Sequence, residues 1–210
     1  EEKQQQLLNF LVEGGGPTGV EFAAEMHDIL EEDITKTYPG LSGKVSIVLL
    51  EATQHILNTF DAALSEYTAK LFRRQNIQLR TASPVKKIDA RRIYLKDGTA
   101  IPHGLVVWTA GVGPSDLVKS LPLPKDRSSR ILTDDSFRIP GYEAVYAMGD
   151  CATPREKNFP ATAQVAQQEG KYLAMALANK IKGGEARPFR YRHYGMLAYI
   201  GSNRALADLA

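Results

Sequence analysis

The chain has 210 residues, of which 43% are hydrophobic and 24% are charged. This composition is typical of one large globular domain or two small ones. Its 26 basic and 24 acidic residues leave a net charge of +2, and the basic residues are scattered, so the charge pattern predicts no nucleic-acid surface. The single cysteine, Cys151, excludes a disulfide within the chain, a Cys-x-x-Cys redox pair and a zinc cluster of cysteines.

The sequence shows neither a membrane span nor a targeting signal. No apolar run approaches the roughly 18 residues that would cross a bilayer. The chain opens with "EEKQQQLLNF", without an initiator methionine, and ends inside the pattern "ALADLA". We therefore expect a fragment of a longer protein.

The first elements predict a strand, a glycine turn and a helix. The segment "LLNFLV" (7–12) has the length and composition of a strand, and apolar residues recur with helical spacing from Val20 to Ile34. Between them, Gly14, Gly16 and Gly19 fit the pattern G-x-G-x-x-G of dinucleotide-binding turns. The first glycine permits the tight turn, the second lets a pyrophosphate approach the backbone, and the third lets the helix pack on the strand. The predicted binding turn contains Gly14, Gly15, Gly16, Pro17, Thr18 and Gly19.

A second buried strand, "KVSIVLLEA" (44–52), carries an acidic residue at its end. Glu51 can there accept hydrogen bonds from the adenosine ribose hydroxyls and repel a 2′-phosphate. The interval from Gly14 is longer than the usual ~20 residues. A solvated glutamate without a ligand is the alternative interpretation.

The remainder of the first half predicts one helix and several short strands. The helix fits residues 61–76, with Leu64, Tyr67, Leu71 and Phe72 on one face. Alternating segments follow at 85–90 and 91–101, with a turn at Asp97–Gly98, and then the strand "LVVWTAG" (105–111). Together these elements predict a Rossmann-type unit closed by a small β-meander.

The second half begins with a polar, proline-rich connection (120–130). "YEAVYAMGD" (142–150) is expected to be a strand that ends in Gly149 and Asp150, and residues 161–181 are expected to form a helix. The Gly-Asp pair is either an ordinary turn or part of a ligand site shared with the start of that helix.

Six segments resemble one enzyme family in collinear order: "GGGPTGVE", "LLEA", "VVWTAGV", "YAMGDCA", "PATAQVAQQEGKYLA" and "HYGMLAYIGSNRALADL". They are similar to the type II (alternative) NADH dehydrogenases, flavoproteins that pass electrons from NADH through FAD to a quinone without pumping protons. The resemblance covers nearly the whole chain. It implies an α/β flavoprotein with two dinucleotide-binding domains: residues 1–113 as the NADH-binding Rossmann domain and 114–210 as the return segment of the FAD-binding domain.

The resemblance also implies roles for individual residues. Asp150 would hold the ribitol of FAD, and the helix that starts near Ala161 would point its N-terminus at the flavin. Gln164 and Gln168 would line the cleft where quinone meets flavin; the alternative is that they lie on a solvated helix face. Glu21 would lie near the nicotinamide; the alternative is that it is an acidic residue that only stabilises the helix start. Glu13 departs from the family, which has a small apolar residue there. Further expected cofactor contacts are Gly111, Gly149 and Ala163.

By the same resemblance the protein would lie peripherally on the mitochondrial inner membrane, attached through a C-terminal region outside this chain. Its partners would be NADH, quinone and the membrane surface, with no nucleic acid and no metal; homodimerisation is left open. Two other classes remain at this point. One is another pyridine-nucleotide flavoprotein, such as a disulfide reductase or an apoptosis-inducing-factor-like protein. The other is a non-catalytic nucleotide-binding fragment.

Overall fold

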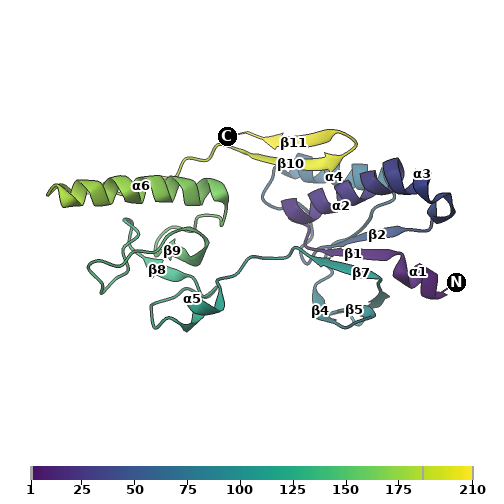
Figure 1. The fold of residues 1–210 in the computed structure, drawn as a ribbon, viewed down its shortest axis with the longest axis horizontal. Coiled ribbons are helices and arrows are strands. Elements are labelled where there is room, and N and C mark those ends of the chain that lie inside the picture. The colour runs from purple at the N-terminus through teal and green to yellow at the C-terminus, as the bar shows by residue number, and fades with distance from the viewer. Residues whose placement is uncertain (1, 186, 210) are drawn as a thin grey trace. The chain divides into compact units, whose positions relative to one another are not determined.

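The computed structural model describes residues 2–185 and 187–209 (Figure 1). The chain forms two compact units, of which the second is Val112–His193. The first contains the residues up to Gly111 together with those from Tyr194 onward. By packing, the C-terminal segment thus belongs with the first unit, whereas the sequence division had grouped it with the second half.

A parallel sheet forms the centre of the first unit, in the strand order β3-β2-β1-β7. The strands are β1 (Asn9–Glu13), β2 (Ser46–Leu50), β3 (Gln78–Arg80) and β7 (Leu105–Trp108). The predicted α/β fold is confirmed. The first strand begins later than predicted, because residues Glu2–Leu7 form a helix, α1, from residues with high helix propensity.

Helices α2 (Pro17–Ile29) and α4 (Ala62–Arg74) cover one face of this sheet. A π-helical turn (Leu30–Ile34), α3 (Thr35–Thr37) and a 3-10 turn (Pro39–Leu41) follow α2. Asp61 caps α4 by accepting a hydrogen bond from the amide of Ala63 (2.8 Å). Tyr67 is 47% exposed, so its predicted place on the buried face is wrong. Thr68 is buried on this helix instead. Its hydroxyl can be buried because it donates a hydrogen bond to the carbonyl of Leu64 one turn earlier.

The predicted β-meander covers the other face. It consists of β4 (Val85–Ile88), β5 (Arg92–Leu95) and β6 (Ala100–Pro102), paired antiparallel. Ile93, Leu95 and Ile101 pack on Leu11 and Leu50 of the sheet. The predicted turn between β5 and β6 is present, with Gly98 in the left-handed region (φ +93°).

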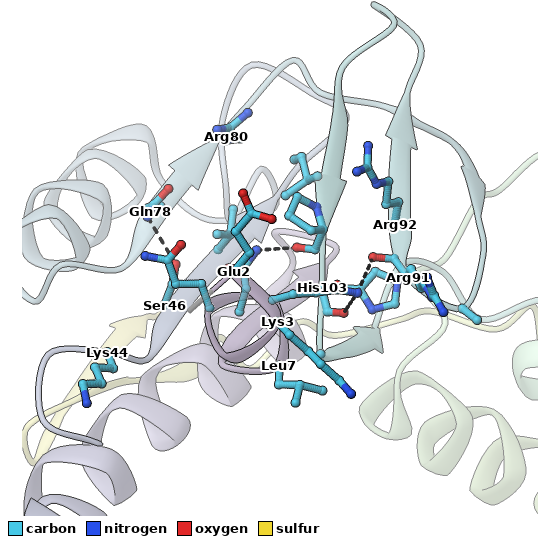
Figure 2. A pocket seen from close by; sticks show the side chains of 18 residues that line it. Glu2, Lys3, Leu7, Lys44, Ser46, Gln78, Arg80, Arg91, Arg92 and His103 are labelled. Atoms are coloured by element: carbon cyan, nitrogen blue, oxygen red, sulfur yellow. Dashed lines mark hydrogen bonds between the residues drawn. The ribbon is translucent and has the colours of Figure 1, made fainter. Parts of the chain in front are cut away.

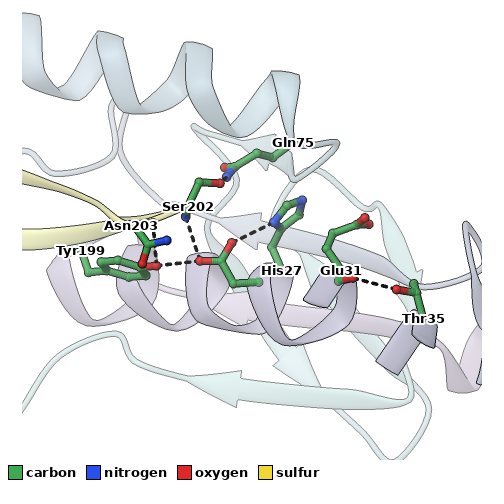
Figure 3. Close-up of polar contacts among 8 residues, drawn as sticks. His27, Glu31, Thr35, Gln75, Tyr199, Ser202 and Asn203 are labelled. Carbon is green, nitrogen blue, oxygen red and sulfur yellow. Dashed lines mark hydrogen bonds and ion pairs between the residues drawn. The ribbon is translucent and has the colours of Figure 1, made fainter. Parts of the chain in front are cut away.

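The hairpin of β10 (Met196–Gly201) and β11 (Arg204–Asp208) packs on α2. Asp28 of α2 accepts hydrogen bonds from the Tyr199 hydroxyl (2.7 Å) and the Ser202 amide (2.8 Å), beside His27 (Figure 3). Burial alone would raise the pKa of Asp28, but these contacts outweigh it and hold that pKa below its ordinary value. This anchoring, together with buried apolar residues of the hairpin, explains why the C-terminal segment joins the first unit.

The second unit contains α5 (Asp116–Ser120), β8 (Ile131–Thr133), β9 (Ala152–Pro154) and α6 (Ala163–Ile181). The parallel pair β8–β9 was not predicted. The predicted strand at 142–150 is wrong: this segment has one isolated bridge, Arg138–Tyr146, and ends in a 3-10 turn at Gly149–Cys151. Tyr142, Val145 and Met148 are exposed, so this apolar stretch has no sheet to pack on. Within the described part of the chain, no helix is long and apolar enough to cross a membrane.

Candidate functional site: the glycine turn and the Gly-Asp turn

Two glycines of the turn between β1 and α2 allow close packing. A Cβ on Gly19 would overlap the carbonyl oxygen of Gly14, so a side chain there would push α2 away from the strand. Gly14 has a φ of +111°, and a Cβ on it would lie 2.7 Å from the hydroxyl of Thr109. Both glycines therefore have the geometric role that the motif predicts.

Gly16 differs from them because the space around it is open. No atom lies within 4 Å of the position where its Cβ would be, and its φ of −71° suits any residue. It is the N-cap of α2, no side chain caps the helix, and Pro17 occupies the first helical position. The first amides of a helix have no acceptor inside it and carry the positive end of the dipole. Open space beside these donors fits a pyrophosphate group.

Glu51 at the end of β2 is bonded to the glycine turn. One carboxylate oxygen accepts from the amide of Gly15 and the other from the amide of Thr53, each at 2.7 Å. The carbonyl of Gly15 in turn accepts from the amide of Leu57 (2.7 Å). Glu51 therefore stabilises the turn through two hydrogen bonds and is not a freely solvated side chain. Each of its oxygens keeps a further lone pair that a ribose hydroxyl can use.

Glu13, the last residue of β1, is 4% exposed, although it is a glutamate. Burial raises its pKa to about 7, and the neighbouring Glu51 carboxylate contributes in the same direction. Its Oε2 has no hydrogen-bond partner among the residues that the structure describes. The site therefore contains, directly before the glycine turn, a carboxyl group whose pKa lies near neutral pH.

Thr109, just after β7, is a positioning residue that the sequence analysis missed. Its hydroxyl lies 2.8 Å from the carbonyl of Glu13 and 3.2 Å from that of Gly14. Gly111 follows in the left-handed region (φ +78°) with open space around it. The sequence offered no signal for Thr109 beyond its place in "VVWTAGV", because its contacts depend on the pairing of β1 with β7.

Glu21 lies in the second turn of α2 and contacts the C-terminal hairpin. Its Oε1 accepts a hydrogen bond from the amide of Tyr199 (3.2 Å). The side chain is half-buried in the first unit. This contact adds a structural role that neither interpretation of the sequence had included.

The Gly149–Asp150 turn of the second unit is held by a residue that the sequence analysis missed, Glu169. Its Oε2 accepts from the amide of Gly149 at 2.6 Å, and Gly149 adopts a φ of +71°. Burial raises the pKa of Glu169, and the Asp150 charge adds to this, while the bond from Gly149 acts in the opposite direction. Asp150 itself is exposed. Glu169 therefore fixes the backbone of the turn, and Asp150 on the same turn is exposed to solvent.

The start of α6 lies beside this turn, as the sequence analysis considered. Thr162 caps the helix by accepting from the amide of Val165, so Ala163 is its first residue. Asp150, Ala161 and Val165 line the same small hollow, of about 10 Å³. A carboxylate and a helix N-terminus that share one hollow fit hydroxyl and polar groups of a bound cofactor.

Gln164 and Gln168 lie one turn apart on α6, as predicted, and both contact the chain at 191–192. The Tyr191 hydroxyl donates to Oε1 of Gln164 (2.7 Å). The amide group of Gln168 donates to the carbonyl of Arg192 (2.8 Å) and accepts from its backbone amide (3.0 Å). The two glutamines thus hold this segment along α6. Among the described residues no group of His, Cys, Asp and Glu has the arrangement of a metal site.

The sequence model of one family, pyridine nucleotide-disulphide oxidoreductase, matches residues 1–170 of this chain. The chain belongs to the pyridine nucleotide-disulphide oxidoreductase family. This membership agrees with the Rossmann-type sheet and with the open turn at Gly16.

Within the pyridine nucleotide-disulphide oxidoreductases, the chain is similar to named NADH dehydrogenases. It is 40% identical to a "Probable NADH dehydrogenase" of Dictyostelium discoideum, over 98% of this chain and 46% of that protein. It is 39% identical to the mitochondrial "Internal alternative NAD(P)H-ubiquinone oxidoreductase A1" of Arabidopsis thaliana, over 100% of this chain and 44% of that protein. The chain therefore spans about half the length of the curated relatives that it matches.

Two solved structures have a similar fold. The NDH2 structure from Plasmodium falciparum in complex with NADH has a TM-score of 0.92 at 23% identity, over 99% of this chain and 59% of that one. A ferredoxin reductase from Rhodopseudomonas palustris has a TM-score of 0.66 at 22% identity, over 87% of this chain and 43% of that one. The alternative interpretation as a disulfide reductase is not favoured, because the matched relatives are named for ubiquinone.

Proposed function

We propose that the full-length protein is an FAD-dependent, non-proton-pumping NADH:quinone oxidoreductase of mitochondria. Similarity over the whole chain to proteins named NADH–ubiquinone oxidoreductases supports this proposal. The structural observation that carries it is the open space at Gly16, directly before an uncapped helix N-terminus. Because no side chain caps this helix, its first amides are available to an anion in that open space.

In this proposal residues 1–113 bind NADH. The amides at the start of α2 hold the pyrophosphate, with Gly15, Pro17 and Thr18 shaping the turn. Glu51 uses its remaining lone pairs for the adenosine ribose and disfavours a 2′-phosphate. Gly111 leaves room for the nicotinamide half beyond the end of β7. Glu21 then positions the nicotinamide or moves a proton near it.

Residues 114–210 contribute to the FAD site and to the quinone cleft, although the last of them pack with the first unit. FAD, which these residues would help to hold, would supply the chemistry that links hydride transfer from NADH to two-electron reduction of the quinone. Asp150, on the turn that Glu169 holds through the Gly149 amide, would accept from the ribitol hydroxyls, and Ala163, the first residue of α6, would bring the helix dipole toward the flavin. Gln164 and Gln168 border the quinone while they hold the 191–192 segment.

The location follows from the relatives' names. Several are named mitochondrial, and we infer the same compartment for this protein. The proposal includes the finer statement, which is peripheral attachment to the inner membrane through a segment outside this chain.

A valine at Gly16 tests the proposal without disturbing the fold. Because a Cβ there meets no atom within 4 Å and φ is ordinary, Gly16→Val should fold normally and bind FAD normally. The side chain would occupy the pyrophosphate position, so we expect at least about a tenfold higher KM for NADH in decylubiquinone reduction. Gly40→Val, also in open space without a positive φ, is the matched control. An unchanged KM for NADH, or no quinone reduction by the wild-type protein, would contradict the proposed function.

A further inference from the structure

A large cavity is lined by residues of the parallel sheet and of the meander, and it extends from the first residues of β1, β2 and β3 to Arg80, the last residue of β3 (Figure 2). Its volume is about 1090 Å³. Asn9, Ser46 and Gln78, which line it, are the first residues of β1, β2 and β3, and the glycine turn follows the last residue of β1. No residue of the glycine turn lines the cavity, although the carbonyl of Arg80 accepts a hydrogen bond from the amide of Glu51 (2.9 Å). The volume of the cavity is similar to that of small-molecule sites.

Positive charge is concentrated in this cavity. It is lined by two lysines and three arginines, against one carboxylate, that of Glu2, although the whole chain is almost balanced. Within the described part of the chain, none of these five cations takes part in an ion pair. Concave surfaces with one sign of charge concentrate the electrostatic field and attract counter-ions. The five residues are Lys3, Lys44, Arg80, Arg91 and Arg92.

The two adjacent arginines are carried by an ordered turn. One oxygen of Asp89 accepts from the backbone amides of both Arg91 and Arg92, at 2.9 Å each. The carbonyl of Arg91 accepts from the amide of His103 (3.0 Å), and the buried imidazole of His103 contacts the carbonyl of Asp89 (3.1 Å). Gln6 of α1 also reaches the carbonyl of Arg91. Fixed backbone below both side chains lowers the entropy cost of holding an anion.

The remaining wall suits an organic group attached to the anion. Leu7, Val48 and Ile101 supply apolar surface, while Asn9, Ser46 and Gln78 supply polar groups. Guanidinium groups match the oxygen atoms of phosphate with paired hydrogen bonds. A concave site suits a soluble molecule, which can enter it, better than the headgroup of a lipid that stays in a flat membrane.

We propose that this cavity is a second ligand site that binds a soluble phosphorylated small molecule, with its phosphate groups on Arg80, Arg91 and Arg92. Lys3 and Lys44, which also line the cavity, add electrostatic attraction for the anion. The site does not depend on the proposed oxidoreductase activity, because it shares no residue with the glycine turn.

The test is calorimetric titration of the full-length protein with tripolyphosphate at low salt, with NAD⁺ already saturating the dinucleotide site. We expect saturable binding with one site per chain. The variant Arg91→Ser/Arg92→Ser should weaken it at least about tenfold, because two charge-assisted contacts are lost. Lys86→Ser/Lys87→Ser is the matched control: it removes the same charge from the neighbouring strand β4, outside the cavity, and should change the affinity less than about twofold.

Further measurements distinguish a soluble phosphorylated molecule from a lipid headgroup and test whether the variants are folded. Lys44→Ser, on a different segment, should also weaken tripolyphosphate binding, while the melting temperature of each variant stays that of the wild type. Flotation with vesicles of phosphatidylcholine and phosphatidylserine should be unaffected by Arg91→Ser/Arg92→Ser. The proposal would be overturned if Lys86→Ser/Lys87→Ser weakened tripolyphosphate binding as much as the arginine variant does. It would also be overturned if tripolyphosphate did not bind saturably, or if Arg91→Ser/Arg92→Ser reduced vesicle binding but not tripolyphosphate binding.

Discussion

The ionisation of Glu13 makes the stability of the protein depend on pH. Its pKa is raised from an ordinary 4.5 to about 7, first by burial and then by the Glu51 charge. Between these values the folded protein keeps a proton that the unfolded chain has released. The free energy of unfolding therefore receives its full contribution from Glu13 below pH 4.5 and loses it as the pH rises through 7.

Replacing Glu13 by glutamine should remove this dependence. We expect the wild-type protein to lose roughly 2 kcal/mol more unfolding free energy than Glu13→Gln between pH 5 and pH 8. Urea denaturation at several pH values measures the difference. Glu32→Gln, at an exposed position, should follow the wild-type curve. Parallel curves for all three proteins would mean that Glu13 ionises normally.

In the proposed function Glu51 selects NADH over NADPH, and its contacts with the glycine turn affect what the substitution Glu51→Gln would change. Glutamine has one acceptor oxygen, so Glu51→Gln leaves either the Gly15 or the Thr53 amide without its bond. We expect weaker binding of NADH and also a smaller preference for NADH over NADPH, because repulsion of the 2′-phosphate is lost. The ratio of kcat/KM for the two nucleotides in full-length enzyme is the readout, with the exposed Glu66→Gln as control. A preserved ratio would remove Glu51 from the ribose site.

Glu21 is suited to a clean test because its structural bond survives the substitution. In Glu21→Gln the side-chain oxygen can still accept from the amide of Tyr199, while the charge and the titratable proton are lost. We expect turnover of the full-length enzyme to fall at least about tenfold, roughly 1.4 kcal/mol of barrier. Stopped-flow kinetics assigns the role: slower flavin reduction indicates positioning of NADH, and slower reoxidation by quinone indicates proton delivery. If flavin reduction and reoxidation in Glu21→Gln both have wild-type rates and the FAD content is normal, Glu21 has only a structural role.

At the scale of elements, the hairpin β10–β11 depends on one carboxylate of α2. Asp28 binds both Tyr199 and Ser202 of the hairpin (Figure 3), so Asp28→Ala removes two bonds from a partly buried position. We expect a loss of about 1–2 kcal/mol in unfolding free energy and faster hydrogen exchange of the hairpin amides. Asp33→Ala, at an exposed position of the following turn, should change neither quantity. Unchanged exchange in Asp28→Ala would show that apolar packing alone holds the hairpin.

Local patterns predicted the elements whose signal lies within a short stretch of sequence. The glycine turn, the meander turn at Gly98 and α6 depend on residues that are close in the chain, and their positions were predicted well. The failures depend on distant partners. Residues 142–150 are apolar enough for a strand but have no sheet to join, and Thr109 and Glu169 obtain their roles from backbone groups far away in sequence.

At the scale of the molecule, each unit leaves large apolar side chains in solvent. In the first unit Trp108 is 56% exposed, and in the second Val112 and Ile181 are 82% and 87% exposed. The curated relatives are about twice as long as this chain, so we expect these surfaces to pack on other parts of the full-length protein.

The isolated 210-residue chain should therefore lack bound flavin. The Gly149–Asp150 turn and the start of α6 form a hollow of about 10 Å³, far smaller than the several hundred Å³ that enclose a cofactor-sized ligand. We expect the purified chain to be colourless, inactive with NADH and quinone, and prone to associate through its exposed apolar side chains. Visible absorbance after purification, with light scattering for association, measures both properties, and the full-length protein prepared in parallel should be yellow. A yellow, monomeric 210-residue chain with stoichiometric FAD would mean that the residues holding the flavin all lie within this sequence.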